Sequence, residues 1–169
     1  MSGLRIVIPG EPVAQGRSRV GVVTLKSGVT RGVIFDPKKS RNWKATAQEH
    51  MVSQAARRPP ILGPVRLEVV AIFSCPASDF RKREPRPRRR HTKKPDADNV
   101  LKAVKDAAKG VLWRDDSQVC DVRITKWIGA QGGAPRVEIE VEEIQEAAAQ
   151  VAPSTAEHDP GDDDELLLF

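Results

Sequence analysis

The chain has 169 residues and a net charge of +5, with 39% hydrophobic and 4% aromatic residues. This suits one modest core with a segment left over, and it excludes two full domains. No apolar run approaches the roughly 20 residues of a membrane span, and the first ten residues lack the features of a signal peptide. The distant cysteines Cys75 and Cys120 predict neither a disulfide framework nor a zinc site, so we expect both to be small core residues in a reducing cytoplasm.

The charge is divided unevenly along the chain. All 28 Lys and Arg residues precede residue 137, whereas nine of the 23 acidic residues lie in 142–169. Residues 1–141 therefore carry 28 basic groups against 14 acidic ones, a net charge of +14. A basic domain followed by an acidic tail favours a polyanionic partner, above all nucleic acid, over a merely solvated surface.

Hydrophobic periodicity divides the chain into interleaved strands and helices. In chain order we expect a strand at 4–8, a hairpin of strands at 20–25 and 29–35, a helix at 37–57, a strand at 65–74, a helix at 98–109, and strands at 119–128 and 137–142. Asp36-Pro37 is typical of a helix start, Asp98 can cap the second helix, and Gly110 ends it. The strand at 65–74 is apolar on both faces, which predicts a central position. The expected fold class is α/β (α+β), with a small mixed sheet packed with two main helices.

The segment 75–95 is Pro-rich, poor in apolar residues and strongly basic, so we expect a mobile loop. Contacts of its basic residues with phosphates would supply affinity and salt dependence but no base reading. The alternative is a solubilising or localisation run. The residues concerned are Arg81, Lys82, Arg83, Arg86, Arg88, Arg89, Arg90, Lys93 and Lys94.

Carboxylates gather directly after this loop. Asp96 and Asp98 flank one residue, and in an extended segment both would point to the same side and could meet one ion. Lys102 lies one helical turn beyond Asp98, and Asp106 one turn further. Asp115-Asp116 follows the helix, where the chain can return to the helix start.

Converging carboxylates without His or Cys partners suit a hard cation such as Mg²⁺. Such an ion can activate water and screen a phosphodiester, while a nearby lysine stabilises the developing charge. Each residue also has a simpler interpretation. Asp98 can be only a helix cap, Asp115-Asp116 only a surface turn, and Lys102 only a solvated helix residue.

Several motifs resemble the signature of RusA-type Holliday-junction resolvases. They are Pro95-Asp96-Ala97-Asp98-Asn99-Val100-Leu101-Lys102, Asp106-Ala107, Gly110-Val111-Leu112-Trp113 and Asp115-Asp116-Ser117-Gln118-Val119. Ile8-Pro9-Gly10-Glu11-Pro12 with Arg17 and Arg19 also resembles the opening strand and basic turn of that family, although Ser18 stands where Pro is expected. The resemblance covers about residues 4–143.

The resemblance implies a homodimeric, Mg²⁺-dependent endonuclease of four-way DNA junctions in a bacterial cytoplasm, acting in recombination, repair or phage DNA processing. Mn²⁺ is expected to substitute for Mg²⁺. Asp96, Asp98 and Asp116 match the catalytic metal-binding acids, Lys102 matches an essential lysine, and Asp115 is a further candidate ligand. Two sites related by a two-fold axis suit a two-fold junction. The rival interpretations are a branched-DNA-binding protein without cleavage and a nuclease that acts on forks or flaps.

We expect a nuclease domain at 1–143, a disordered linker at 144–161 and a partner-docking tail at 162–169. Glu165-Leu166-Leu167-Leu168-Phe169 is similar to the pentapeptide that binds the bacterial sliding clamp, with Leu166, Leu168 and Phe169 matching. The tail also resembles the acidic tip of single-stranded-DNA-binding protein. A third interpretation is that the tail folds over the basic loop and limits nonspecific DNA binding.

Overall fold

The computed structural model describes residues 3–145 and confirms the mixed α/β class. Most of the predictions for the linker and the tail lie outside the described residues. The elements are β1 (Leu4–Pro9), β2 (Arg19–Thr24), β3 (Thr30–Phe35), α1 (Lys38–Gln54), β4 (Val65–Phe73), β5 (Arg89–Arg90), α2 (Ala97–Ala108), β6 (Val119–Ile128) and β7 (Arg136–Glu143), with 3₁₀ turns η1 (Ala77–Asp79) and η2 (Asp116–Gln118).

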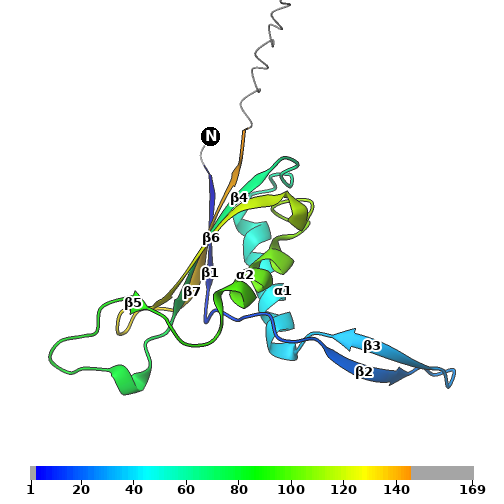
Figure 1. Ribbon diagram of the computed structural model, residues 1–169, viewed down its shortest axis with the longest axis horizontal. Coiled ribbons are helices and arrows are strands. Elements are labelled where there is room, and N and C mark those ends of the chain that lie inside the picture. Colours follow the sequence, from blue (N-terminus) through cyan, green and yellow to red (C-terminus); the bar gives the residue numbers. More distant parts are fainter. Residues whose placement is uncertain (1–2, 146–169) are drawn as a thin grey trace, which may run out of the picture.

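The main sheet has five strands in the order β1-β7-β4-β6-β5. Strand β4 is central, as its apolar faces predict, and it pairs in parallel with β6 and antiparallel with β7. Strands β2 and β3 form a separate two-stranded sheet, which projects from the body of the molecule (Figure 1). The hairpin immediately precedes α1 in the chain, so the end of β3 is close to the start of that helix.

Both helices lie on the same side of the main sheet (Figure 1). The core forms between them and the inward side chains of the strands, including the fully buried Ile6, Leu67, Met51 and Val104. Each such side chain contributes roughly 1.5–3 kcal/mol by leaving water. The opposite face of the sheet carries ion pairs between strands, such as that of Arg66 with Asp121 and Glu142.

The first helix joins the edge of the sheet through its last residue. The side-chain amide of Gln54 accepts a hydrogen bond from the backbone N–H of Val7 at 2.9 Å and donates one to the Val7 carbonyl at 2.8 Å. These are the outward backbone groups of edge strand β1, which would otherwise be free to pair with another chain. Among residues 3–145, no helix is long and apolar enough to cross a membrane.

Several local predictions require correction. Pro37, not Asp36, holds the cap position of α1, and that helix ends at Gln54 because Ala56 and Arg57 turn the chain away with φ angles of 49° and 61°. Helix α2 begins at Ala97, so Asp98 lies inside its first turn rather than capping it. Cys75 is buried as expected.

Cys120, in contrast, is exposed. The strand that covers the outer edge of β6 pairs only with Trp127 and Ile128, so the beginning of β6 lies at an open edge of the sheet. The alternation of apolar and polar residues in β6 therefore indicated a strand correctly, but the apolar positions are not buried along its whole length.

Lys44 of α1 links the base of the hairpin to α2. Its ammonium group lies 2.6 Å from the carboxylate of Asp36 and 3.3 Å from that of Asp106. Hydrogen bonds from Lys44, and then from Gln15 and Ser18, lower the pKa of Asp36 from 3.8 to about 2. Partial burial works against the charge on Lys44, but its hydrogen bonds to the two carboxylates outweigh this and raise the pKa of Lys44.

Because the pKa of Asp36 is lower in the folded state, its ionised form stabilises the fold above about pH 4, and this contribution is lost as the pH falls to about 2. We expect Asp36→Asn to lower the free energy of unfolding at pH 7 by about 1–2 kcal/mol. The difference from the unsubstituted protein should shrink on acidification between those two values. Urea unfolding at a series of pH values measures it.

The matched control is Asp121→Asn, which removes a carboxylate whose side chain is 51% exposed in its ion pair with Arg66. This change should cost less than about 1 kcal/mol. Equal losses for the two variants would show that the Lys44 link adds nothing beyond an ordinary surface charge.

Candidate metal centre and nucleic-acid interface

One face of α2 carries three charged side chains at intervals of four residues, Asp98, Lys102 and Asp106. They line a surface depression of about 260 Å³ together with Asp116 of η2. The helical spacing explains why the first three share a face. Asp116 comes from a different element, so the structure brings together residues that the sequence separates by a helix and a turn.

A buried tryptophan places Asp116 at the depression. Gly110 has a φ of +77°, a conformation that favours glycine, and its N–H donates to the Trp113 carbonyl at 2.7 Å. The chain therefore turns back after α2 and inserts the fully buried Trp113 into the core. The Trp113 Nε1–H donates to Oδ1 of Asp116 at 2.9 Å. Sequence reasoning assigned no role to Trp113, although its place inside the resemblance motif was a signal.

Asp115 organises the turn itself. Its carboxylate accepts the N–H of Ser117 at 3.0 Å and lies 2.7 Å from the ammonium of Lys109. The side chain of Gln118 completes the cap by accepting the Asp115 N–H at 2.7 Å. The hydrogen bond from Lys109, followed by those from Ser117, holds the pKa of Asp115 well below its usual range. These contacts give Asp115 a structural role in the turn, which is the simpler interpretation weighed beside its candidacy as a metal ligand.

Asp96 and Asp98 face different depressions. Asp96 occupies the cap position of α2 without a side-chain capping bond, and it lines a second depression of about 690 Å³ with Gln15, Arg17 and Lys94. Asp96 keeps an extended backbone, with φ −69° and ψ 150°, whereas Asp98 lies in the first turn of α2, so the segment is not extended through both residues as expected. The predicted DNA-binding residue Arg17 thus lies at the same depression as Asp96.

The donor set fits a magnesium ion that keeps water ligands. Within residues 3–145, no three His, Cys, Asp or Glu side chains come together closely enough to hold a metal ion by themselves. Mg²⁺ in nucleotide-processing sites commonly uses only one or two carboxylates, with water and phosphate as the other ligands. In this part of the chain, ion pairs engage Asp106 and Asp115 but not Asp96, Asp98 or Asp116. The last three carboxylates are therefore available, and Asp98 and Asp116 line the same depression.

The basic loop 75–95 has more structure than the sequence predicted, although its mobility stays a prediction. The side chain of Gln131 accepts the Arg81 N–H at 2.9 Å and donates to the Arg81 carbonyl at 3.1 Å. Arg89 forms an ion pair with Asp79 of η1. Two short elements, η1 and β5, thus lie inside a segment whose composition predicted none.

Trp127 of β6 supports two arginines of this loop. The guanidinium carbons of Arg88 and Arg90 lie 4.3 and 3.8 Å from the centre of its ring. Such cation–π contacts orient arginines while leaving their N–H groups free for phosphate. The sequence analysis missed this arrangement, since the tryptophan is distant in sequence from the basic residues that it contacts.

The end of the loop is held next to the carboxylates. The ammonium of Lys126 donates to the Lys93 carbonyl at 2.8 Å and to the Pro95 carbonyl. These bonds fix the segment immediately before Asp96, so the last basic residues of the loop lie beside the start of α2. Phosphates bound along the loop would therefore approach the acidic site.

Comparison with known proteins identifies the family of this chain. The chain matches the family described as Endodeoxyribonuclease RusA over residues 9–142. It is also 33% identical over 152 residues to a protein of Bacillus subtilis (strain 168) described as "Uncharacterized protein YqaN", covering 85% of this chain and 99% of that protein. The fold and the site define a mixed α/β domain with an acidic centre beside a basic loop. The chain belongs to the RusA endodeoxyribonuclease family.

We expect Asp98→Asn and Asp116→Asn each to reduce Mg²⁺-dependent cleavage of four-way junctions on the order of a hundredfold, because each removes a charged oxygen donor from the site. The sequence resemblance predicts the same for Asp96→Asn. Junction binding should persist in all three variants, because less negative charge faces the DNA. Single-turnover cleavage and gel-shift assays measure the two properties separately.

Asp115→Asn is the matched control. It removes a neighbouring carboxylate that already forms an ion pair with Lys109. This variant should therefore lose more thermal stability than cleavage activity per folded molecule. If Asp98→Asn and Asp116→Asn both turned over normally, the assignment of the metal site would be wrong.

Neutralising Arg88 and Arg90 together as glutamines should weaken DNA binding and flatten its salt dependence. Each lost phosphate contact changes the slope of log K against log salt by roughly 0.9 on duplex DNA, so the pair should change it by roughly 1.8. The control is Arg5→Gln, which removes an arginine paired with Glu138 at 3.2 Å on the charged face of the sheet. Fluorescence anisotropy at several salt concentrations provides the slopes, and an unchanged slope would show that the two arginines do not contact the backbone.

Proposed function

We propose that this protein is a Mg²⁺-dependent endonuclease that selects four-way DNA junctions. The observation that carries the proposal is the depression where Asp98, Asp116 and Lys102 meet in a member of the RusA family. Acidic residues within a domain of net charge +14 would oppose DNA binding unless a cation offset them. The loop that ends beside Asp96 supplies the positive charge for the DNA backbone.

Each residue of the site has a separate task in this proposal. Asp96, Asp98 and Asp116 would hold the metal ion. The bound ion would lower the pKa of water and neutralise charge on the scissile phosphodiester. Lys102 stabilises the negative charge that develops on the phosphoryl oxygens, and Trp113 is a positioning residue that orients Asp116 through its Nε1–H. By analogy with the family, the products carry a 5′-phosphate and a 3′-hydroxyl.

The proposal includes a homodimer acting on branched DNA. A four-way junction has two-fold symmetry, so two copies related by a two-fold axis can place one acidic site at each of two opposing strands. Branched-DNA binding without cleavage and preference for forks or flaps are the alternatives, and the assay below distinguishes them.

The test uses four-way, forked and linear duplex DNA of matched length, with either Mg²⁺ or EDTA. We expect cleavage of the four-way junction with Mg²⁺, none with EDTA, and little cleavage of the linear duplex. Mn²⁺ should restore activity after metal removal. Tight junction binding without Mg²⁺-dependent cleavage would contradict the nuclease assignment, and faster cleavage of forks would contradict the junction preference.

A further inference from the structure

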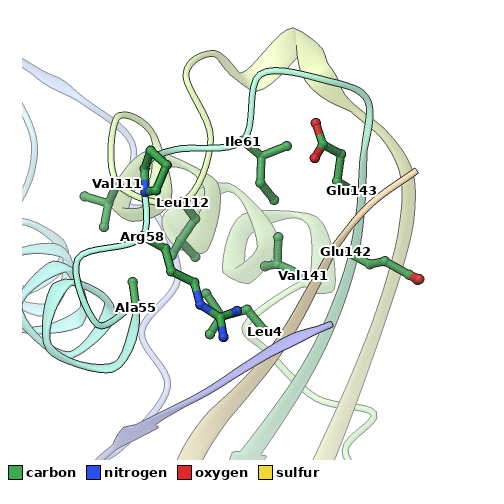
Figure 2. Close-up of a pocket in the computed structure, with 10 residues that line it drawn as sticks. Leu4, Ala55, Arg58, Ile61, Val111, Leu112, Val141, Glu142 and Glu143 are labelled. Carbon is green, nitrogen blue, oxygen red and sulfur yellow. The ribbon is translucent and has the colours of Figure 1, made fainter. Parts of the chain in front are cut away.

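A small apolar pocket lies beside the C-terminal end of β7. It is not part of the proposed nuclease site. Its walls come from four parts of the chain and include Leu4, Ala55, Ile61, Val111, Leu112 and Val141 (Figure 2). The pocket has a volume of about 140 Å³. Apolar cavities of about this size, near 150 Å³, take up a benzene ring. The pocket therefore has room for one aromatic or branched aliphatic side chain.

One arginine, Arg58, lines the pocket, and Arg57 precedes it in the chain. Residues Ala56 and Arg57 both adopt left-handed φ angles, which cost non-glycine residues of the order of 1 kcal/mol each. This strained bend follows α1 directly and exposes Arg57 and Arg58. Arg58 lines the pocket, and Figure 2 shows its side chain lying beside Leu4. Within residues 3–145, no ion pair involves either arginine.

The acidic residues nearby are already engaged. Glu142 pairs with Arg66 at 3.3 Å, and Glu143 accepts the N–H of Gly63 at 3.0 Å. Both glutamates line the pocket, but within residues 3–145 neither forms an ion pair with Arg58. Arg58 is therefore open to a carboxylate from a ligand whose apolar side chain enters the pocket.

The part of the chain beyond the described residues has this chemistry. Residues 146–169 contain no Lys or Arg, and they end in Asp162-Asp163-Asp164-Glu165 followed by Leu166-Leu167-Leu168-Phe169. The described chain ends beside the pocket, because Val141, Glu142 and Glu143 line it and the Ile144 N–H donates to the Pro64 carbonyl at 2.8 Å. The 20 residues from 146 to 165 can span up to roughly 70 Å, far more than a return to the pocket requires.

We propose that the C-terminal segment docks in this pocket of its own chain, with Phe169 in the apolar interior and residues 162–165 beside Arg57 and Arg58. The tether makes docking intramolecular, at an effective concentration of roughly 1 mM, so a Kd of about 0.1 mM leaves about nine-tenths of the molecules docked. This inference is independent of the proposed nuclease activity. It also makes the pocket and any external protein that binds Leu166, Leu168 and Phe169, such as a sliding clamp, competitors for one segment.

A docked segment would also contact the part of the chain that positions the acidic site. Leu112 of the pocket wall is adjacent to Trp113, and the Leu112 carbonyl accepts the N–H of Ile61 at 2.9 Å. An occupant of the pocket therefore packs against the segment that positions Asp116.

Disulfide trapping in the full chain tests the contact directly. In a Cys120→Ser background, Val111→Cys lines the pocket and Leu168→Cys lies in the segment. The control pairs Leu168→Cys with Val22→Cys, which is 70% exposed on the hairpin, and it reports random collisions. With glutathione disulfide as oxidant, we expect the pocket pair to link within one chain about tenfold faster. Equal rates would overturn the proposal, and a covalent dimer would show that the segment belongs to a second copy, which overturns docking within one chain.

Hydrogen exchange supplies a second measurement that does not depend on new cysteines. The substitutions Leu168→Ala and Phe169→Ala lie outside residues 3–145, and we expect the fold of that part of the chain to be retained. Exchange in 55–61 and 109–113 should become about tenfold faster in this double variant, while 19–35 stays unchanged. Identical exchange in both proteins would overturn the proposal and leave the segment to an outside partner. Junction cleavage is scored separately, so its failure would not be confused with failure of docking.

Discussion

The burial of Trp113 is the interaction on which the acidic site depends. Its ring is fully buried in the core, and its carbonyl closes the turn at Gly110. The same residue directs its only side-chain donor to Asp116. Because leaving the Trp113 indole N–H without an acceptor in the core would be costly, the packing of this ring is coupled to the position of one carboxylate. A change that loosened the core here would move Asp116 relative to Asp98, even though neither acid is itself part of the core.

The acids near α2 fall into two groups that have different partners. Lys44 holds Asp36 and Asp106, and Lys109 holds Asp115, so these carboxylates tie elements together. Asp96, Asp98 and Asp116 have no such partner in the part of the chain that the structure describes. Lysines thus compensate the acids that connect elements, and under the proposed function a cation would compensate the others.

Residues distant in sequence also hold the basic loop in place. Trp127 orients Arg88 and Arg90, Gln131 fixes the backbone at Arg81, and Lys126 holds the segment before Asp96. All three supporting residues come from β6 or the turn that follows it. The basic groups of the loop are therefore anchored on the same sheet that carries the core, which sets their distance from α2.

Local sequence patterns predicted most of the elements and the helical face that carries Asp98, Lys102 and Asp106, because periodicity and a four-residue spacing depend only on near neighbours along the chain. The packing of the chain was needed to bring Asp116 to the depression on this face and to place Asp96 at the neighbouring one. It also placed Trp127 beneath the arginines, left Cys120 at an open edge and formed the pocket around Arg58. These outcomes depend on contacts between residues tens of positions apart, and packing sets such contacts because local patterns leave many arrangements of the same elements open.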